Sequence, residues 1–343
     1  MAQFKRFDLV TKPFEITAEI FSKRRVLITG GLGFIGSNLA RKLAASGSKV
    51  TVIDSLIPEY GGNLRNLFEA PNGILVNIAD VRDRFSMRHL VRGHDVLFNL
   101  AGQTSHMDSM RDPFTDLDIN VTAQLSILEA CREFNPTIDI VFASTRQIYG
   151  RPQYLPVDEK HPVNPVDVNG VDKFAGEQFH ILYQSVYGLK TRVLRLTNTY
   201  GPRMRIKDAR QTFLGIWIKQ ILAGQAFEVW GGEQLRDFNY IDDVIDAMLH
   251  VVAEPKTIGQ VYNLGSPERI NLRDLAQLLV QVVGAGRFKI LQFPEERMKI
   301  DIGDYYSDSS KIESALGWRP VVPLADGLAR TVSFFRDHFD HYS

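Results

Sequence analysis

The chain has 343 residues, of which 44% are apolar and 23% charged, and its formal net charge is zero. This length fits one large domain, or a large domain with a smaller one. The sequence contains no run of about five like charges, which would suggest a nucleic-acid surface, and no run of about 18 apolar residues, which would suggest a membrane span. The single cysteine, Cys131, excludes an intramolecular disulfide, fits a reducing cytoplasm, and lies in an apolar-periodic stretch that predicts a buried structural thiol. We therefore expect a cytoplasmic protein with no metal site and no nucleic-acid or membrane partner.

Between residues 25 and 200, short apolar runs alternate with helical periodicity. Strands are expected at residues 26–29, 50–53, 74–76, 96–100, 138–142 and 191–195, and helices at residues 35–45 and 122–134. Near-continuous apolar strands separated by helices are typical of a parallel sheet that is covered on both faces. The pattern predicts an α/β, doubly wound (Rossmann) domain over residues 25–200.

After residue 200 the pattern is more irregular. Helices are expected at residues 213–223, 243–253, 272–283 and 324–338, with a short strand at 227–230 and a turn at 317–320. We predict a smaller, mixed α/β domain over residues 201–343 that is partly interleaved with the first. Residues 1–24 form an N-terminal extension without the apolar core of a signal peptide. Surface packing and support of an oligomer are both open for it.

The glycine-rich segment TGGLGFIG joins the first strand to the first helix. Gly30 permits a tight turn, Gly33 lets the backbone approach a pyrophosphate, and Gly36 lets helix and strand pack closely. The helix begins with Phe34 and Ile35, and its N-terminus offers unpaired N–H groups and a partial positive charge to phosphates. This segment predicts a dinucleotide site.

Acidic residues follow the second and third strands. Asp54 ends the second strand, where its carboxylate can accept hydrogen bonds from ribose hydroxyls and would repel a 2′-phosphate. This placement favours NAD over NADP. Asp80 and Val81 follow the third strand as candidate adenine contacts, although Asp80 could equally be a helix N-cap.

Further motifs follow in chain order. They are NLAGQ at 99–103, NV at 120–121, FAST at 142–145, IYG at 148–150, KFAGE at 173–177, RLTNTYGP at 195–202, RDF at 236–238, YIDDV at 240–244 and YNLG at 262–265. Together with the glycine loop they resemble the NAD-dependent epimerase/dehydratase family, extended short-chain dehydrogenases that act on nucleotide sugars. The resemblance covers about residues 25–335. It implies that Leu100, Ala101, Gln103 and Lys173 also contact NAD.

The resemblance also implies a chemistry. In the family a tyrosinate takes a sugar hydroxyl proton as a hydride moves to NAD, a Ser or Thr shares the hydrogen bond, and a Lys lowers the tyrosine pKa. Thr145 and Lys173 match the Ser/Thr and Lys positions. The tyrosine position holds Asn169, whose amide neither gains nor loses a proton near neutral pH, so it cannot be the general base. On a helix, Asp172 and Lys173 lie three and four residues after Asn169, on neighbouring faces.

Four side chains are candidates for the missing base. Lys173, once desolvated, could act directly or through a water, and Thr145 could relay a proton. Tyr149 occupies a position where the family has a tyrosine without this role, which favours a structural function. His106 follows the fourth strand, where the family's loop faces the sugar, so we expect it to contact substrate and it could also titrate.

The two residues after Thr145 argue against dehydration and decarboxylation. Family dehydratases carry an Asp-Glu pair there, and related decarboxylases place a Glu in the same stretch. Here Arg146 and Gln147 stand in those places, and neither is an acid–base residue near neutrality. Two interpretations of Arg146 are open: contact with an anionic group of the sugar, or a solvated surface side chain.

The resemblance implies that Asn198, Arg236 and Arg297 bind the diphosphate of a nucleotide sugar, whose two charges need paired donors. For Arg236 the alternative is a surface ion pair with Asp237 or Asp242, and Arg297 has a similar alternative.

Two further sets of segments match the family. Residues 214–218 and 227–229 resemble those that enclose the nucleotide base, without showing which base. The helices at 122–134 and 172–187 correspond to those that form a dimer contact in relatives, so we favour a homodimer.

Three functions are therefore open. The leading one is an NAD-dependent nucleotide-sugar epimerase, at carbon 4, that uses transient hydride transfer to bound NAD. The others are a keto-sugar reductase or dehydrogenase, and a binding protein that retains NAD and nucleotide sugar but has lost turnover through Asn169.

Overall fold

The computed structural model describes residues 20–60 and 62–343, so most of the N-terminal extension lies outside the described residues. Of that extension, Phe21 is fully buried, and its ring centroid lies 6.4 Å from that of Phe98 in the central sheet. None of the described helices is long and apolar enough to cross a membrane.

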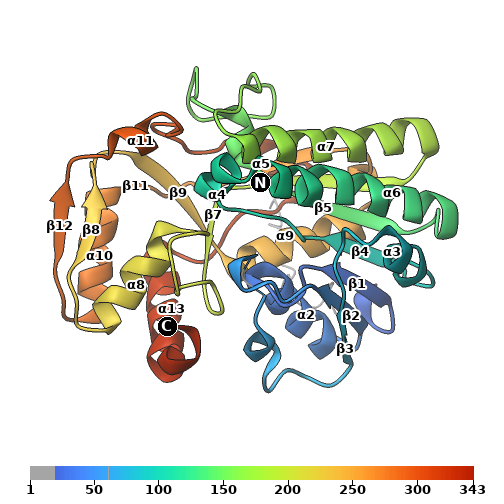
Figure 1. The fold of residues 1–343 in the computed structure, drawn as a ribbon, viewed down its shortest axis with the longest axis horizontal. Helices are drawn as coiled ribbons and strands as arrows, with labels where there is room; N and C mark the ends of the chain where they lie inside the picture. The colour runs from blue at the N-terminus through green and yellow to red at the C-terminus, as the bar shows by residue number, and fades with distance from the viewer. Residues whose placement is uncertain (1–19, 61) are drawn as a thin grey trace, which may run out of the picture.

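A parallel sheet forms the centre of the protein (Figure 1). Its strands are β1 (Arg25–Thr29), β2 (Lys49–Asp54), β3 (Ile74–Ile78), β4 (Val96–Asn99), β5 (Asp139–Thr145), β6 (Lys190–Leu196) and β10 (Val261–Leu264). They lie in the order β10-β6-β5-β4-β1-β2-β3, and every neighbouring pair is parallel. The predicted doubly wound α/β fold is confirmed.

Helices cover both faces of the sheet (Figure 1). One face carries α3 (Arg84–Leu90), α6 (Ala123–Phe134) and α7 (Val168–Tyr187), and the other carries α2 (Phe34–Ala45) and α9 (Ile241–Ala253). Three short helices precede α6: α4 (His106–Arg111), α5 (Pro113–Leu117) and a π-helical turn, η3 (Asp118–Thr122). The helix expected at 122–134 is therefore continuous with a segment of different winding.

Most of the remaining elements form a second region at the left of Figure 1, whereas α12 (Ser310–Leu316) packs against β10 of the large sheet. The elements of the second region are β7 (Asn198–Tyr200), α8 (Phe213–Leu222), β8 (Phe227–Trp230), β9 (Leu235–Tyr240), β11 (Arg269–Asn271), α10 (Leu272–Val283), β12 (Phe288–Leu291), α11 (Glu295–Met298) and α13 (Leu324–Tyr342). Strands β11, β9 and β7 make one small sheet, and β12 and β8 another. The chain crosses between the two regions, because β10 returns to complete the large sheet beside β6.

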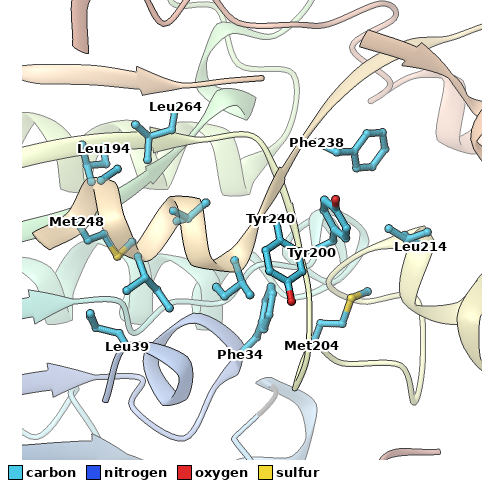
Figure 2. Close-up of a cluster of buried hydrophobic side chains, with 14 of the residues drawn as sticks. Phe34, Leu39, Leu194, Tyr200, Met204, Leu214, Phe238, Tyr240, Met248 and Leu264 are labelled. Carbon is cyan, nitrogen blue, oxygen red and sulfur yellow. The ribbon is translucent and has the colours of Figure 1, made fainter. Parts of the chain in front are cut away.

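One apolar core joins the sheet to this second region (Figure 2). Leu39 of α2, Leu194 of β6 and Met248 of α9 are fully buried in it, as is Leu214 of α8. Each such side chain stabilises the fold by roughly 1.5–3 kcal/mol through its removal from water. A shared core of this kind fixes the relative position of the strand ends of the sheet and of the second region, where the cavities described next lie.

Candidate active site

The glycine loop lies between β1 and the start of α2. Gly30 has φ +67°, and a Cβ there would lie 3.0 Å from the backbone of Ala101. Gly33 is the N-cap of α2, and no side chain caps the helix. The first N–H groups of α2 therefore remain free to bind an anion. Residues of this loop line a cavity, which fits a dinucleotide with its phosphates at the helix N-terminus.

The close approach at Gly36 differs from the prediction. A Cβ on Gly36 would lie 2.3 Å from the carbonyl oxygen of Gly30, so this glycine packs against the loop itself and not against a strand. The approach to a strand is made by Gly31, whose Cβ would lie 2.3 Å from the Cβ of Val52 in β2. Gly36 thus brings the first turn of α2 against the loop, and Gly31 brings the loop against β2.

Asp54 stands at the end of β2 beside this loop. Its two carboxylate oxygens accept hydrogen bonds from the backbone N–H groups of Leu32 and Leu56, each at 3.0 Å. Burial raises its pKa, and the two backbone donors oppose that rise. Asp54 lines the same cavity as Gly30, and each carboxylate oxygen retains a lone pair for a ribose hydroxyl.

The N-cap alternative for Asp80 is wrong. Asp83 caps α3 by accepting a hydrogen bond from the N–H of Phe85, whereas Asp80 pairs with Arg82 at 2.6 Å. Hydrogen bonds from Arg82 lower the pKa of Asp80. Together with Val81, Asp80 lines a smaller cavity that continues from the glycine loop, so its adenine contact stays a prediction.

Every other residue predicted to contact NAD also lines the main cavity. These residues are Gly30, Gly33, Phe34, Ile35, Gly36, Leu100, Ala101, Gln103 and Lys173. The Thr29 hydroxyl accepts hydrogen bonds from the N–H groups of Leu100 and Ala101, each at 3.1 Å. This hydroxyl therefore ties the end of β4 to the end of β1.

Asn169 lies on α7 at the far side of the same cavity. Its Nδ2 donates to the carbonyl oxygen of Gln103 at 2.8 Å and to Oδ2 of Asp116 at 3.2 Å. Both partners are acceptors, so the nitrogen must face them. The amide oxygen of Asn169 is then the atom left to accept a hydrogen bond, and the side chain cannot be turned round without losing two bonds.

Two carboxyl groups lie behind this amide. Asp172 forms a side-chain hydrogen bond with Asp116, and Oδ1 of Asp116 also accepts from Asn120 at 2.9 Å. Burial, with the hydrogen bond to Asp116 and its negative charge, raises the pKa of Asp172 to about 7. Two buried carboxyls in contact cannot both ionise easily, so the pair retains one proton near neutral pH.

Lys173 and Thr145 complete this part of the cavity. Burial lowers the pKa of Lys173 to about 8, against the opposing charges of Asp116 and Glu177. The ammonium nitrogen lies 4.5 Å from the ring centroid of Phe142. The Thr145 hydroxyl accepts from the N–H of Gln147 at 3.2 Å, which leaves its proton free to donate. A lysine with this pKa is partly uncharged at pH 8 and can accept a proton.

His106 begins α4 and lies between the main cavity and a second one. Its Nδ1 is 2.9 Å from Oδ2 of Asp167. Burial raises the pKa of Asp167, but the contact with His106 and the donors Gly170 and Gln147 outweigh it, so this pKa lies below its usual value. His106 is therefore neither simply solvated nor free, because it is held by a carboxylate.

Tyr149 does not reach the cavity. It is fully buried, and its hydroxyl donates to Asn263 at 2.7 Å and accepts from Arg195 at 2.6 Å. Burial raises its pKa to about 12. Tyr149 has the structural function that the sequence favours, and the same holds for the buried thiol of Cys131, whose pKa burial raises to about 12.

The second cavity is lined by arginines. They are Arg111, Arg146, Arg210, Arg236 and Arg297. Arg236 is buried and pairs with Asp301 at 3.4 Å, so the ion pair expected as an alternative has a different partner from Asp237 or Asp242. Arg297 stands 4.4 Å from the ring centroid of Trp230.

Asn198 lines both cavities, but its amide is largely engaged. Its Nδ2 donates to the carbonyl oxygen of Asp237, and its Oδ1 accepts from Arg146, each at 2.9 Å.

The segments predicted to enclose the base lie mostly in the core. Leu214, Ile218, Phe227 and Val229 are fully buried and do not line the cavities described. The neighbouring Phe213 does line the second cavity. The second cavity is therefore lined by the aromatic ring of Phe213 and not by the side chains of the predicted segments.

A family model described as the NAD dependent epimerase/dehydratase family matches residues 26–265. The chain belongs to the NAD-dependent epimerase/dehydratase family. Membership of this family explains the fold, the glycine loop and the two adjoining cavities together. NAD is the cofactor.

Relatives of known activity span almost all of this family member. The UDP-glucose 4-epimerase of Mycolicibacterium smegmatis is 32% identical over 317 residues, which cover 91% of this chain and 99% of that one. The crystal structure of a UDP-glucose 4-epimerase from Thermotoga maritima with UDP-glucose has a TM-score of 0.83 and 30% identity, and covers 92% and 99%. That of a UDP-glucuronic acid 4-epimerase from Bacillus cereus with UDP-glucuronic acid and NAD has a TM-score of 0.81 and 27% identity, with the same coverage. The chain thus stands among nucleotide-sugar epimerases and dehydratases.

Sequence reasoning missed two carboxylates of this epimerase/dehydratase site. Asp167 carries a local signal, because an acid directly before a helix is typical of an N-cap, and it caps α7 at Gly170. Its second contact, with His106, has no local signal. Asp116 has none at all, because it lies 53 residues from Asn169 in the chain.

The acidic pair predicts a pH-dependent stability. Asp172 has a folded-state pKa of about 7, above its usual value, so the folded protein binds more protons than the unfolded chain between about pH 4 and 7. Its stabilisation is therefore present at low pH and lost as the pH rises through 7. We expect Asp172→Asn, which stays uncharged, to raise the Tm at pH 8 by about 2 °C or more, and to have a smaller effect at pH 5.

Thermal unfolding of the NAD-loaded protein between pH 5 and 8 measures this difference. Asp340→Asn, at an exposed carboxylate near the C-terminus, is the control and should follow the wild type at every pH. An Asp172→Asn curve parallel to the wild type would show that Asp172 does not retain a proton.

Proposed function

We propose that this protein is an NAD-dependent nucleotide-sugar epimerase that acts at carbon 4. The observation that carries the proposal is the junction of the two cavities. The glycine loop, Thr145 and Lys173 line the first, arginines line the second, and both are lined by His106, Arg146, Gln147, Asn198, Gln211 and Thr212. A nucleotide sugar placed across this junction has its diphosphate near Arg236 and Arg297 and its sugar near Thr145.

The glycine loop and Asp54 would hold NAD in the first cavity, and its nicotinamide would supply a reversible hydride acceptor. Lys173, whose pKa is lowered to about 8, takes the hydroxyl proton in place of the missing tyrosine. Thr145 donates to the sugar oxygen, and the amide oxygen of Asn169 accepts from a neighbouring hydroxyl. Asn169 thus orients the sugar, because its nitrogen is already held by Gln103 and Asp116.

The side-chain contacts of the two residues after Thr145 argue against a dehydration reaction, as their residue types do. Gln147 donates its side-chain amide to Asp167 at 2.8 Å, and Arg146 donates to Asn198 at 2.9 Å. Both are fixed by these contacts and neither can deliver a proton to the sugar. A keto-sugar reductase needs the same cofactor site, so it is the second candidate function, and net NADH consumption separates the two.

We also propose a homodimer through α7. Val171, Leu182 and Val186 are exposed, at 53%, 48% and 60%. Their spacing brings them to one side of the helix. The exposed Phe114 lies on α5, which packs against α7. An apolar surface of this kind is typical of a subunit interface.

The first experiment is incubation of the purified protein with NAD and a panel of UDP-, dTDP-, GDP- and CDP-hexoses, with the sugar signals followed by NMR. We expect one sugar to convert to an epimer without net NADH formation, because the cofactor is regenerated in each cycle. Stoichiometric NADH formation would instead identify a dehydrogenase, and NADH consumption in a second incubation with NADH and a nucleotide keto-sugar would identify the reductase. An unchanged panel with a nucleotide sugar still bound would contradict both enzymes and indicate a binding protein.

Substitution of Lys173 tests the proton transfer. Removal of a general base lowers turnover by roughly 10²–10⁴-fold, so we expect at least a loss of about 10² in kcat for Lys173→Ala. Wild-type kcat should rise with pH through an apparent pKa near 8, because the neutral amine is the active form. NAD affinity is measured separately, since Lys173 also lines the cofactor cavity. Lys289→Ala, at an exposed lysine of β12, is the control, and unchanged turnover in Lys173→Ala would refute this role.

Asn169→Tyr separates an enzyme adapted to the asparagine from one that has lost catalysis. A tyrosine ring cannot keep the amide's bonds to Gln103 and Asp116, so we expect no gain in turnover over the wild type. The same NMR assay measures it. A gain from an inert parent would support the binding protein instead.

A further inference from the structure

Arg146 lies at the junction of the two cavities. It directly follows Thr145 and the end of β5, so the backbone fixes its place beside the reacting end of the cleft. Its guanidinium stands 5.3 Å from the ring centroid of Tyr305 and donates through Nη2 to Asn198 at 2.9 Å. Two contacts therefore hold the group in position, and the interpretation of Arg146 as a solvated surface residue is wrong.

No carboxylate of the described residues lies within ion-pair distance of Arg146. Three of the other four arginines of the second cavity do contact a carboxylate. Arg210 pairs with Asp108 at 3.0 Å, Arg111 reaches the same residue at 3.9 Å, and Arg236 pairs with Asp301. Arg297, which stands over Trp230, is farther from the junction because it does not line the first cavity.

Three carboxylates have a charge that reaches Arg146, but none of them forms an ion pair with it. Asp301 pairs with Arg236, and Asp167 lies against His106. Asp237 accepts hydrogen bonds through Oδ2 from the backbone N–H groups of Ser266 and Ser307, and its buried Oδ1 has no hydrogen-bond partner among the described residues. The charge of Asp237 therefore acts on Arg146 from beyond ion-pair distance, and the guanidinium keeps an unpaired donor.

One nitrogen of the guanidinium, Nη1, is buried and has no hydrogen-bond partner among the described residues. Burial lowers the pKa of Arg146, which records the cost of this unpaired charge. A buried donor without a partner is unfavourable and rare in proteins. A bound anion would satisfy it, and a guanidinium presents the forked donors that suit a carboxylate.

We propose that Arg146 binds a carboxylate on the sugar, so that the substrate is a nucleotide sugar whose hexose is acidic. The inference rests on the proposed function, because it needs the sugar at the junction. Arg236 and Arg297 remain available for the two charges of the diphosphate in the second cavity. The carboxylate of the sugar supplies a third negative charge. It would lie against Arg146, the arginine at the junction that forms no ion pair.

Isothermal titration of the NAD-loaded protein with UDP, UDP-glucose and UDP-glucuronic acid tests this assignment. We expect the wild type to bind UDP-glucuronic acid about tenfold or more tightly than UDP-glucose, the gain of one charge-assisted pair. Arg146→Gln should remove that preference and leave the affinities for UDP and UDP-glucose within about twofold. Arg146→Lys, which keeps the charge but not the fork, should retain part of it.

Arg210→Gln is the matched control, because it removes an arginine of the same cavity that already pairs with Asp108. It should keep the preference, and the Tm of each variant reports its folding. The inference is overturned if the wild type shows no preference for UDP-glucuronic acid. It is also overturned if Arg146→Gln weakens the binding of all three ligands equally, since that result assigns Arg146 to the diphosphate. Loss of the preference in Arg210→Gln would overturn it as well. A wild type that binds NAD but neither these three ligands nor any nucleotide sugar of the UDP-, dTDP-, GDP- and CDP-hexose panel would overturn the proposed function itself.

Discussion

The parallel sheet is the constraint on which the site depends. Because all its strands run in one direction, β1, β4 and β5 end at a single edge, and each end carries part of the site. The glycine loop follows β1, Gln103 follows β4, and Thr145 closes β5. The hydroxyl of Thr29 joins the first two ends through its bonds to Leu100 and Ala101. Segments far apart in the sequence therefore form one cofactor cavity.

Asn169, at the position where the resemblance implies a tyrosine, lies in a buried polar cluster. The amide is held between Gln103 and Asp116, and the contact with Asp116 helps to raise the pKa of Asp172. The asparagine is thus a buried side chain whose amide nitrogen donates two hydrogen bonds. The cluster leaves Lys173 as the group at this end of the cavity whose pKa suits proton transfer near pH 8.

The arginines of the second cavity differ in whether a nearby carboxylate compensates their charge. Four of the five arginines of the second cavity either contact a carboxylate or stand over an aromatic ring away from the junction. Of these five arginines, Arg146 is the one that combines a place at the junction with a buried donor that has no partner among the described residues. The chemistry proposed at Lys173 and the substrate class proposed at Arg146 thus rest on separate observations, and one can fail without the other.

The sequence by itself determined the fold and the cofactor loop. Near-continuous apolar runs, apolar residues at helical spacing and the positions of Gly30, Gly33 and Asp54 are local signals, so strands, helices and the NAD-binding turn could be predicted from them. Tertiary structure alone decided what these groups touch. The hydrogen bond between Asn169 and Asp116 joins positions 53 residues apart. Arg146 lacks an ion pair because nearby carboxylates such as Asp301 pair with other residues. Such contacts follow from how helices and loops pack over the sheet, and no local pattern of residues records that.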